Sequence, residues 1–297
     1  MTVPAELEEA FPARPANLHK YAAGVVAVLG GSSRFPHAPV VAGLGARVGG
    51  AGLVHLAVPD ASRFAAAVLL PEATFLDPTA DALPPKVDVA AVGMGLGVSP
   101  ESTRLVMRFL ATYAGRVVLD ADALNILAEQ TGERGALPFL PPGQLRILTP
   151  HEGEAARLLA TTAAAVRNDR AAAARELARR YRAVVVLKGP HTLVVSPDSD
   201  VPFICPAGNP FMAMGGMGDL LGGLMAARWA CLVQRLSATL PPMRVAALAA
   251  AGAVWLHAAA SDDLVASVEG VDPSLVNTAA RIGAWRVRLE RGSHGQS

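Results

Sequence analysis

The sequence predicts an α/β protein in which a doubly wound, mostly parallel sheet is covered by helices on both faces. Three observations support this fold class: short apolar runs rich in β-branched residues recur, helix-like stretches separate most of them, and glycine or polar residues follow them. Continuous apolar runs are typical of strands buried on both faces, because crossover helices cover both sides of a parallel sheet. No linker-like segment and no internal repeat interrupts the 297 residues, so we expect a single domain.

The elements follow in chain order. The expected strands are the apolar runs 25–30, 53–59, 87–93, 116–121, 146–149 and 183–188. A helix is expected at 38–48, and a two-stranded excursion around a Pro-Asp turn at 192–205. Three helices should then close the chain, at 218–233, 243–262 and 273–291.

Composition and charge exclude several classes of protein. Hydrophobic residues make up 52% and charged residues 17% of the chain, which excludes a mainly disordered protein. The net charge is 26 − 25 = +1, so no overall field should attract nucleic acid or an anionic membrane. The apolar run 245–256 is shorter than the ~20 residues that span a bilayer, and we expect a buried helix there. Two cysteines and an N-terminus without a signal-peptide pattern indicate a cytoplasmic protein.

Polar or glycine-rich motifs follow five of the expected strands. They are GGSS at 30–33, GMGLG at 93–97, DAD at 120–122, HEGE at 151–154 and KGPHT at 188–192. Ligands of open parallel sheets bind outside the carboxyl ends of the strands, so five such motifs at one edge predict a binding site. The chain has only three lysines, which makes the lysine of KGPHT informative. As a strand-end lysine, Lys188 is expected to be exposed and to hold a ligand rather than the core.

The sharpest motif is GNPFMAMGGMGD, from Gly208 to Asp219. Gly215, Gly216 and Gly218 remove side chains so that backbone N–H groups can point at one spot, and the following helix adds the positive end of its dipole. This predicts a hole for an anion such as a phosphoryl group. Asp219, in the first turn, could accept the proton of a hydroxyl that attacks that phosphoryl group. The alternative is that Asp219 only caps the helix; the five other motifs favour catalysis.

Several other active-site patterns are absent from the sequence. There is no G-x-x-x-x-G-K-[ST] motif, no G-x-S-x-G elbow, and no second histidine at position 155 to complete a zincin helix. The GMGLG segment lacks the spacing of a dinucleotide-binding fingerprint. His257 lies in an apolar stretch, and we interpret it as a core histidine with satisfied hydrogen bonds.

Taken together, the motifs resemble those of the ADP- or ATP-dependent NAD(P)H-hydrate dehydratases of the ribokinase-like superfamily. The resemblance runs from His19 to about Asp262 and keeps the family's order: HK, VLGGS, VGMGLG, VVLDADALN, LTPHEGEAARLL, VVLKGPHTLV, AGNPFMAMGGMGD and VWLHAAASD. It implies a ribokinase-like domain at 19–291, an N-terminal extension at 1–18 and a C-terminal tail at 292–297. Members phosphorylate the ring hydroxyl of NAD(P)HX, the hydrated form of NAD(P)H, and expel phosphate.

The resemblance also implies roles for individual residues. Asp219 would be the base, with Gly215, Gly216 and Gly218 steadying the phosphoryl group. The adenine nucleotide would lie along Lys188, Gly189, Pro190, His191 and Thr192 and touch Gly218. NAD(P)HX would contact Ala38, Gly95, His151 and Asp219. Asn125 and Glu154 would make further substrate contacts or organise Mg²⁺ through water, with no protein ligand set for a resident metal.

The co-substrate implied by the resemblance is ADP, with ATP as the alternative. A separate NAD(P)HX epimerase would act on the same substrate, and a homo-oligomer, such as a tetramer, is expected. The chain departs from the family's usual residues in the loop SSRFPHAP at 32–39 and at four single positions: Met94, Glu152, Met214 and Met217. Two alternatives stay open: a small-molecule kinase of the hydroxyethylthiazole-kinase type, and a weakly active nucleotide-binding homologue, to which Met214 and Met217 point.

Overall fold

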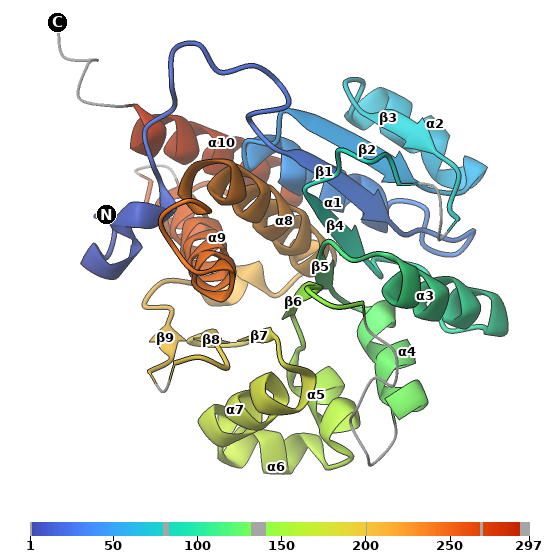
Figure 1. Ribbon diagram of the computed structural model, residues 1–297. Helices are drawn as coiled ribbons and strands as arrows, with labels where there is room; N and C mark the ends of the chain where they lie inside the picture. The colour runs from blue at the N-terminus through green and yellow to red at the C-terminus, as the bar shows by residue number, and fades with distance from the viewer. Residues whose placement is uncertain (1, 80–82, 132–140, 200, 268–269, 292–297) are drawn as a thin grey trace, which may run out of the picture.

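The computed structural model describes residues 2–79, 83–131, 141–199, 201–267 and 270–291. Its centre is a nine-stranded sheet in the order β3-β2-β1-β4-β5-β6-β7-β8-β9 (Figure 1). All neighbours from β3 to β7 are parallel, whereas β7-β8 and β8-β9 are antiparallel. The strands are β1 (Val25–Leu29), β2 (Leu53–Ala57), β3 (Thr74–Leu76), β4 (Val89–Val92), β5 (Arg116–Leu119), β6 (Leu145–Leu148), β7 (Val184–Leu187), β8 (Leu193–Val195) and β9 (Phe203–Ile204).

The predicted doubly wound architecture is confirmed, and so are the six apolar strands and the two-stranded excursion. The sequence did not indicate β3, a three-residue edge strand whose side chains are exposed or only half-buried. A strand that buries so little carries no continuous apolar run, and for that reason periodicity does not detect it.

Helices cover both faces of the sheet. One core cluster joins a face of the sheet to α1 (Ala38–Val48), α8 (Met217–Leu236), α9 (Pro242–Val265) and α10 (Leu275–Glu290). A second cluster joins the other face to α3 (Pro100–Thr112), α4 (Asp122–Thr131), α5 (Glu152–Leu159), α6 (Ala163–Asn168) and α7 (Arg170–Tyr181). The helix α2 (Asp60–Leu69) lies beside β3 at the sheet edge (Figure 1). The three expected closing helices agree with α8, α9 and α10 to within three residues at each end.

Glycines bring α1 and α8 into backbone contact. A Cβ atom on Gly45 would lie 2.1 Å from the carbonyl oxygen of Leu220, and one on Gly223 would lie 1.7 Å from that of Ala42. No side chain fits at either position, so this crossing depends on glycine. The close approach fixes where α8 begins relative to the sheet.

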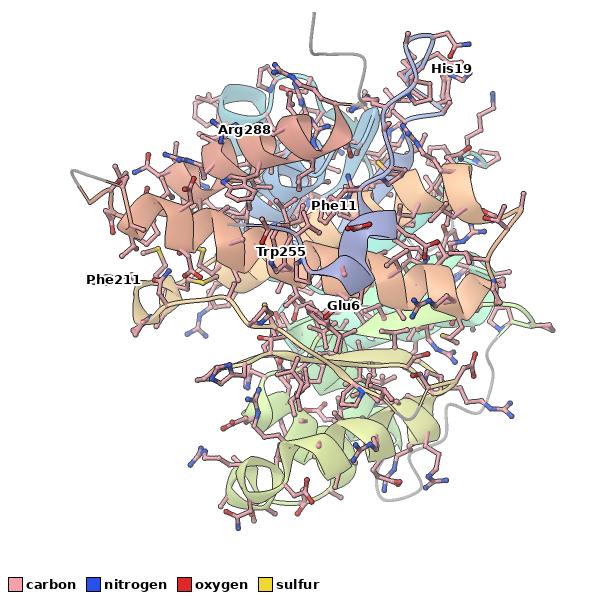
Figure 2. The ribbon with its side chains drawn as sticks, turned by 90° about the vertical axis from the view of Figure 1, so that its left-hand side faces the viewer. Glu6, Phe11, His19, Phe211, Trp255 and Arg288 are labelled. Carbon is pink, nitrogen blue, oxygen red and sulfur yellow. The ribbon has the colours of Figure 1, made fainter. Side chains whose placement is uncertain are left out.

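The helix α9 is long and apolar enough to cross a membrane by length and composition, but 83% of its apolar window is buried inside the protein. The predicted buried helix is therefore confirmed. The short 3₁₀ helix η1 (Ala5–Ala10) packs on α9. The rings of Phe11 and Trp255 lie edge to face, with their centroids 5.7 Å apart (Figure 2). The proposed division at residue 18 stays a prediction, and the predicted tail at 292–297 lies outside the described residues.

His257 on α9 is buried, as predicted, but one of its two ring nitrogens lacks a hydrogen-bond partner among the described residues. Its Nε2 atom has no partner among the described residues, so the expectation of a satisfied core histidine is wrong. Burial lowers its pKa to about 4, and the ring is therefore neutral near pH 7.

Candidate active site

The five strand-end motifs lie along one edge of the sheet. They follow β1, β4, β5, β6 and β7, which are consecutive parallel neighbours in the sheet. Parallel strands end on the same side, so the motifs form one continuous rim, as the sequence predicts.

A buried ion pair lies at the centre of this rim. The Nζ atom of Lys188 donates to Oδ1 of Asp120 at 2.6 Å and lies 3.9 Å from Oε2 of Glu154. The Asp120 side chain is 2% exposed and the Lys188 side chain 19%. Burial alone would lower the pKa of Lys188, but the two carboxylates outweigh it, so the pKa is raised and the lysine stays charged.

The expectation of an exposed Lys188 is therefore wrong. Asp120 follows β5 and Lys188 follows β7, with β6 between them, so the two backbones are about 10 Å apart at the usual strand spacing. The lysine side chain crosses the end of β6 to reach the carboxylate. The pair links residues 68 apart in the chain, and pattern analysis could not reveal it.

The start of α5 is organised by His151 and Glu154. Nδ1 of His151 accepts hydrogen bonds from the N–H groups of Gly153 and Glu154, and Oε2 of Glu154 accepts from the His151 N–H at 2.8 Å. This reciprocal pattern is a capping box. Burial raises the pKa of Glu154 to about 7, with Lys188 opposing that shift, and burial lowers the pKa of His151. His151 is therefore neutral and exposed at the rim.

The start of α8 faces the ion pair. A Cβ atom on Gly218 would lie 3.5 Å from Lys188 Nζ and 3.9 Å from Asp120 Oδ2. Leu220 makes the first backbone hydrogen bond of the helix, to the Gly216 carbonyl, so the N–H groups of Met217, Gly218 and Asp219 precede the helical ladder. Among the described residues no side chain caps this end. These three N–H groups are available to an anion, and the predicted amide hole stays a prediction. The alternative in which the Asp219 side chain only caps the helix is not supported.

Gly215 and Gly216 have different structural constraints. Gly216 is the N-cap of α8 with φ of +89°, and a Cβ atom there would lie 2.8 Å from Leu275 Cδ1. The backbone conformation therefore requires glycine at position 216, whereas a Cβ atom there would press only on the end of the flexible Leu275 side chain. At Gly215 a Cβ atom would meet nothing within 4 Å, so the space beside this residue is open.

Asp219 carries a strongly shifted carboxyl group. Burial raises its pKa to about 7, Asp120 adds to the shift, and Lys188 opposes it. A carboxyl group with a pKa near neutrality, placed beside free backbone donors, is suited to accept and release a proton at physiological pH.

The KGPHT segment forms a fixed loop after β7. Thr192 Oγ1 accepts from the Gly189 N–H at 3.3 Å and donates to the Gly189 carbonyl at 2.9 Å. His191 has a positive φ of 52° and is exposed, as is Pro190. The Arg170 guanidinium donates to the carbonyls of Pro190, Leu187 and Lys188 and so holds this loop from α7. Arg170 lies outside every motif that the sequence offers.

Ala38 and Gly95 are brought together at the β1–β4 end of the rim. A Cβ atom on Gly95, whose φ is +72°, would lie 2.8 Å from Ala38 Cβ and 2.8 Å from the Phe35 carbonyl oxygen. In the first turn of α4, Asn125 Oδ1 accepts from Arg157 Nε at 2.9 Å. Asp122 Oδ2 accepts from the Gly97 N–H at 2.7 Å and ties the GMGLG loop to α4.

The four single-position departures from the family's usual residues occupy different environments. Met94 is fully buried, and its Cε atom fills the space beside Gly222. Glu152 pairs with Arg167 at 3.0 Å and lies 3.6 Å from Arg170. The Met217 side chain is buried in the core, so its backbone and not its side chain belongs to the amide hole, whereas Met214 is 37% exposed.

A separate cavity of about 790 Å³ lies between η1, the β8–β9 hairpin and the start of α9. Leu7, Phe203 and Arg244 are among the residues that line it. None of the predicted site residues does, so this cavity does not belong to the rim.

Solved structures define the class of fold. The chain superposes on an ADP/ATP-dependent NAD(P)H-hydrate dehydratase from Bacillus subtilis, co-crystallised with ATP/Mg²⁺, with a TM-score of 0.77, 29% identity, and 96% and 99% coverage of the two chains. A ribokinase-like superfamily protein from Enterococcus faecalis gives a TM-score of 0.78 at 22% identity, covering 97% and 95%. The protein therefore has the ribokinase-like fold, as predicted.

Residues 26–279 match the NAD(P)H-hydrate dehydratase family model, and the chain belongs to this family. It is 41% identical over 257 residues to the ADP-dependent (S)-NAD(P)H-hydrate dehydratase of Neisseria meningitidis, covering 85% of this chain and 81% of the relative. It is 40% identical over 273 residues to the bifunctional NAD(P)H-hydrate repair enzyme of Gloeobacter violaceus, covering 88% of this chain. It spans only 49% of that bifunctional relative.

Proposed function

We propose that this protein is a nucleotide-dependent lyase that dehydrates NAD(P)HX to NAD(P)H, with ADP as phosphoryl donor. Family membership and 41% identity to a relative named as an ADP-dependent dehydratase support the activity and the donor. The observation that carries the proposal is the position of Asp219, a carboxyl group with a pKa of about 7 beside the free amides of α8.

The amides of Met217, Gly218 and Asp219 bind the phosphoryl group in transfer. They precede the helical ladder, they lie at the positive end of the α8 dipole, and Gly218 leaves space above Lys188. Such donors stabilise charge that develops on phosphoryl oxygens in the transition state. Because these donors belong to the backbone, the methionines at 214 and 217 leave them intact.

Asp219 accepts the proton of the ring hydroxyl as its oxygen forms a bond to the β-phosphorus of ADP and AMP leaves. The phosphorylated ring then loses phosphate as its C–O bond breaks and a proton leaves the neighbouring ring carbon, which restores the double bond of NAD(P)H. Water is removed overall as one hydroxyl and one hydrogen, and ADP becomes AMP and phosphate. The ionised fraction of Asp219 near pH 7 supports the first proton transfer.

The nucleotide lies along the loop from Lys188 to Thr192, which Arg170 holds in place. Lys188 contributes positive charge beneath the phosphates while its Nζ atom stays paired with Asp120. The described residues contain no group of three or more side chains that could hold a metal by themselves. Mg²⁺ needs only one or two carboxylates when phosphates and water complete its shell, so Glu154 fits a water-mediated role. When bound, Mg²⁺ would neutralise phosphate charge.

NAD(P)HX occupies the β1–β4–β6 part of the rim, against Ala38, Gly95 and His151. Gly95 is buried against Ala38 and Phe35, which fixes the GMGLG loop beside the start of α1, and neutral His151 offers a ring nitrogen. Asn125 is already bonded to Arg157, so it acts by positioning that arginine. A separate epimerase acting on the same substrate, a cytoplasmic location and a homo-oligomer complete the proposal.

The test is recovery of absorbance at 340 nm when purified protein is mixed with NADHX or NADPHX, Mg²⁺ and either ADP or ATP. The proposal predicts recovery with a nucleotide and none without it. A stable phosphorylated product would instead indicate a kinase of the hydroxyethylthiazole-kinase type. Nucleotide binding without any turnover would indicate a degenerate nucleotide-binding homologue.

A further inference from the structure

Two motifs of this chain have no role in the chemistry described above: the GNP turn at 208–210 and the VWLHAAASD segment at the end of α9. The structure brings them together. The Gly208 N–H donates to Asp262 Oδ2 at 2.8 Å, and Asn209 Nδ2 donates to Asp262 Oδ1 at 2.7 Å. Asn209 Nδ2 also donates to the fully buried Ser261 Oγ at 3.0 Å. Both oxygens of the Asp262 carboxylate thus accept hydrogen bonds from the same turn.

From this anchor the chain reaches the amide hole by a short, internally bonded path. Asn209 Oδ1 accepts from the Phe211 N–H at 3.1 Å and caps the 3₁₀ turn η3 (Pro210–Met212). Backbone hydrogen bonds then join Met212 to Asn209, Ala213 to Pro210 and Met214 to Met212. Only Gly215 separates this turn from Gly216, the N-cap of α8.

The exposed side chains of this loop contribute little to holding it in place. Phe211 is 59% exposed and lies at the edge of the molecule (Figure 2), and Met214 is 37% exposed. At its far end Gly216 abuts Leu275 Cδ1. The loop is therefore held at three places: by Asp262 at its start, by Met212 against the core in its middle, and by the packing of Gly216 on α10 at its end.

We infer that Asp262 is a positioning residue: through Asn209 and the turn that follows, it sets the direction in which the backbone enters α8 and hence where the amides of 217–219 point. The inference rests on the proposed function for its catalytic consequence, whereas the geometric part concerns the free protein. Asp262 touches none of the residues that we place around the reacting atoms, so it acts only through the loop.

The variants Asp262→Asn and Asn209→Asp each break the network. In Asp262→Asn an NH₂ group replaces one carboxylate oxygen and faces another donor. In Asn209→Asp two carboxylates face each other. The double variant with both changes restores every bond, with donor and acceptor exchanged in the two side-chain bonds of residue 209. The new amide at 262 donates to the new carboxylate at 209 and accepts from the Gly208 N–H, and the Ser261 hydroxyl donates instead of accepting.

Asp263→Asn is the matched control. Asp263 is the next residue on α9 but accepts from Arg281 at 2.5 Å and from Trp285 Nε1 at 2.9 Å, and so joins α9 to α10 rather than to the loop. The substitution is chemically identical and removes two charge-assisted contacts. It should therefore reproduce any general loss of stability without altering the loop.

Two measurements test the inference on the full chain. Hydrogen–deuterium exchange of the free protein should be at least about tenfold faster over 208–219 in each single variant, and near the parent rate in the double variant and in Asp263→Asn. In the 340 nm assay, kcat should fall about tenfold or more in the single variants while KM for NADHX changes less than about threefold, with recovery in the double variant.

Parent-like exchange and turnover in both single variants would overturn the inference, and so would equal effects in Asp263→Asn. Failure of the double variant to recover exchange would also overturn it. If the parent protein shows no dehydration at all, the proposed function fails, and the exchange measurement alone then decides whether Asp262 positions the loop.

Discussion

The main effect of replacing Lys188 with methionine should be a loss of fold stability. Methionine keeps most of the volume of the side chain but leaves Asp120, whose side chain is 2% exposed, without its counter-charge. Removing one partner of a buried ion pair costs about 3–5 kcal/mol. Asp120 keeps one hydrogen bond, from the Ala121 N–H at 2.8 Å, so we expect the lower end, about 3 kcal/mol.

Thermal and urea unfolding measure this loss. For a chain of this size 1 kcal/mol corresponds to about 2–4 °C, so the melting temperature should fall by about 6 °C or more. The double variant Lys188→Met with Asp120→Asn removes the unpaired charge and should recover most of the loss. Lys86→Met, an exposed lysine over the Tyr21 ring, is the control and should change the melting temperature by less than about 1 °C.

The sequence alone suggested the opposite order of effects, because a strand-end lysine was expected to be exposed. An unchanged melting temperature in Lys188→Met, combined with lost ADP binding, would refute the buried ion pair as a structural element. Equal destabilisation in the single and double variants would show that the two charges are not coupled.

Four further predictions concern the start of α8. Asp219→Asn should lower kcat by about 10²–10⁴-fold while ADP affinity stays within about threefold, measured by absorbance at 340 nm and by calorimetry; unchanged kcat would exclude Asp219 as the base. Because the pKa of Asp219 is raised to about 7, kcat/KM should rise about tenfold per pH unit below pH 7 and level off above it, and a flat profile from pH 5 to 8 would contradict this. By linkage, the same raised pKa means that the folded state binds more protons than the unfolded state between about pH 4 and 7. The contribution of Asp219 to the free energy of unfolding therefore falls as pH rises through that window. Urea titrations should show this fall in the parent protein but not in Asp219→Asn. Gly216→Ala places a Cβ atom at φ of +89° against Leu275 and should cost about 1–3 kcal/mol with a fall in kcat, whereas Gly215→Ala, which meets nothing, should be stable; equal stability of both would contradict the geometry.

The strands and the rim could be predicted from the sequence because both depend on local patterns. Val25–Leu29 and Val184–Leu187 are continuous apolar runs, and a parallel sheet places the motifs that follow them at one edge. Gly216 and Asp219 could be singled out because a glycine-rich turn before a helix leaves backbone N–H groups available to an anion, and their roles stay predictions.

Long-range contacts could not be predicted in this way. The Asp120–Lys188 pair spans 68 residues and crosses a strand, and the Asn209–Asp262 bond spans 53. Neither leaves a periodic signal, because each depends on which elements become neighbours in space. The strand-end position of the DAD and KGPHT motifs was the available hint for the first pair, and an aspartate just beyond the apolar part of α9 was the hint for the second.

The most direct test of the account is a single reaction in which NADH, inorganic phosphate and AMP are measured together from NADHX, ADP and Mg²⁺. The account predicts one phosphate and one AMP for each NADH formed by the parent protein, and loss of all three products together in Asp219→Asn. Phosphate or AMP release without NADH, or NADH formation that does not depend on Asp219, would contradict it.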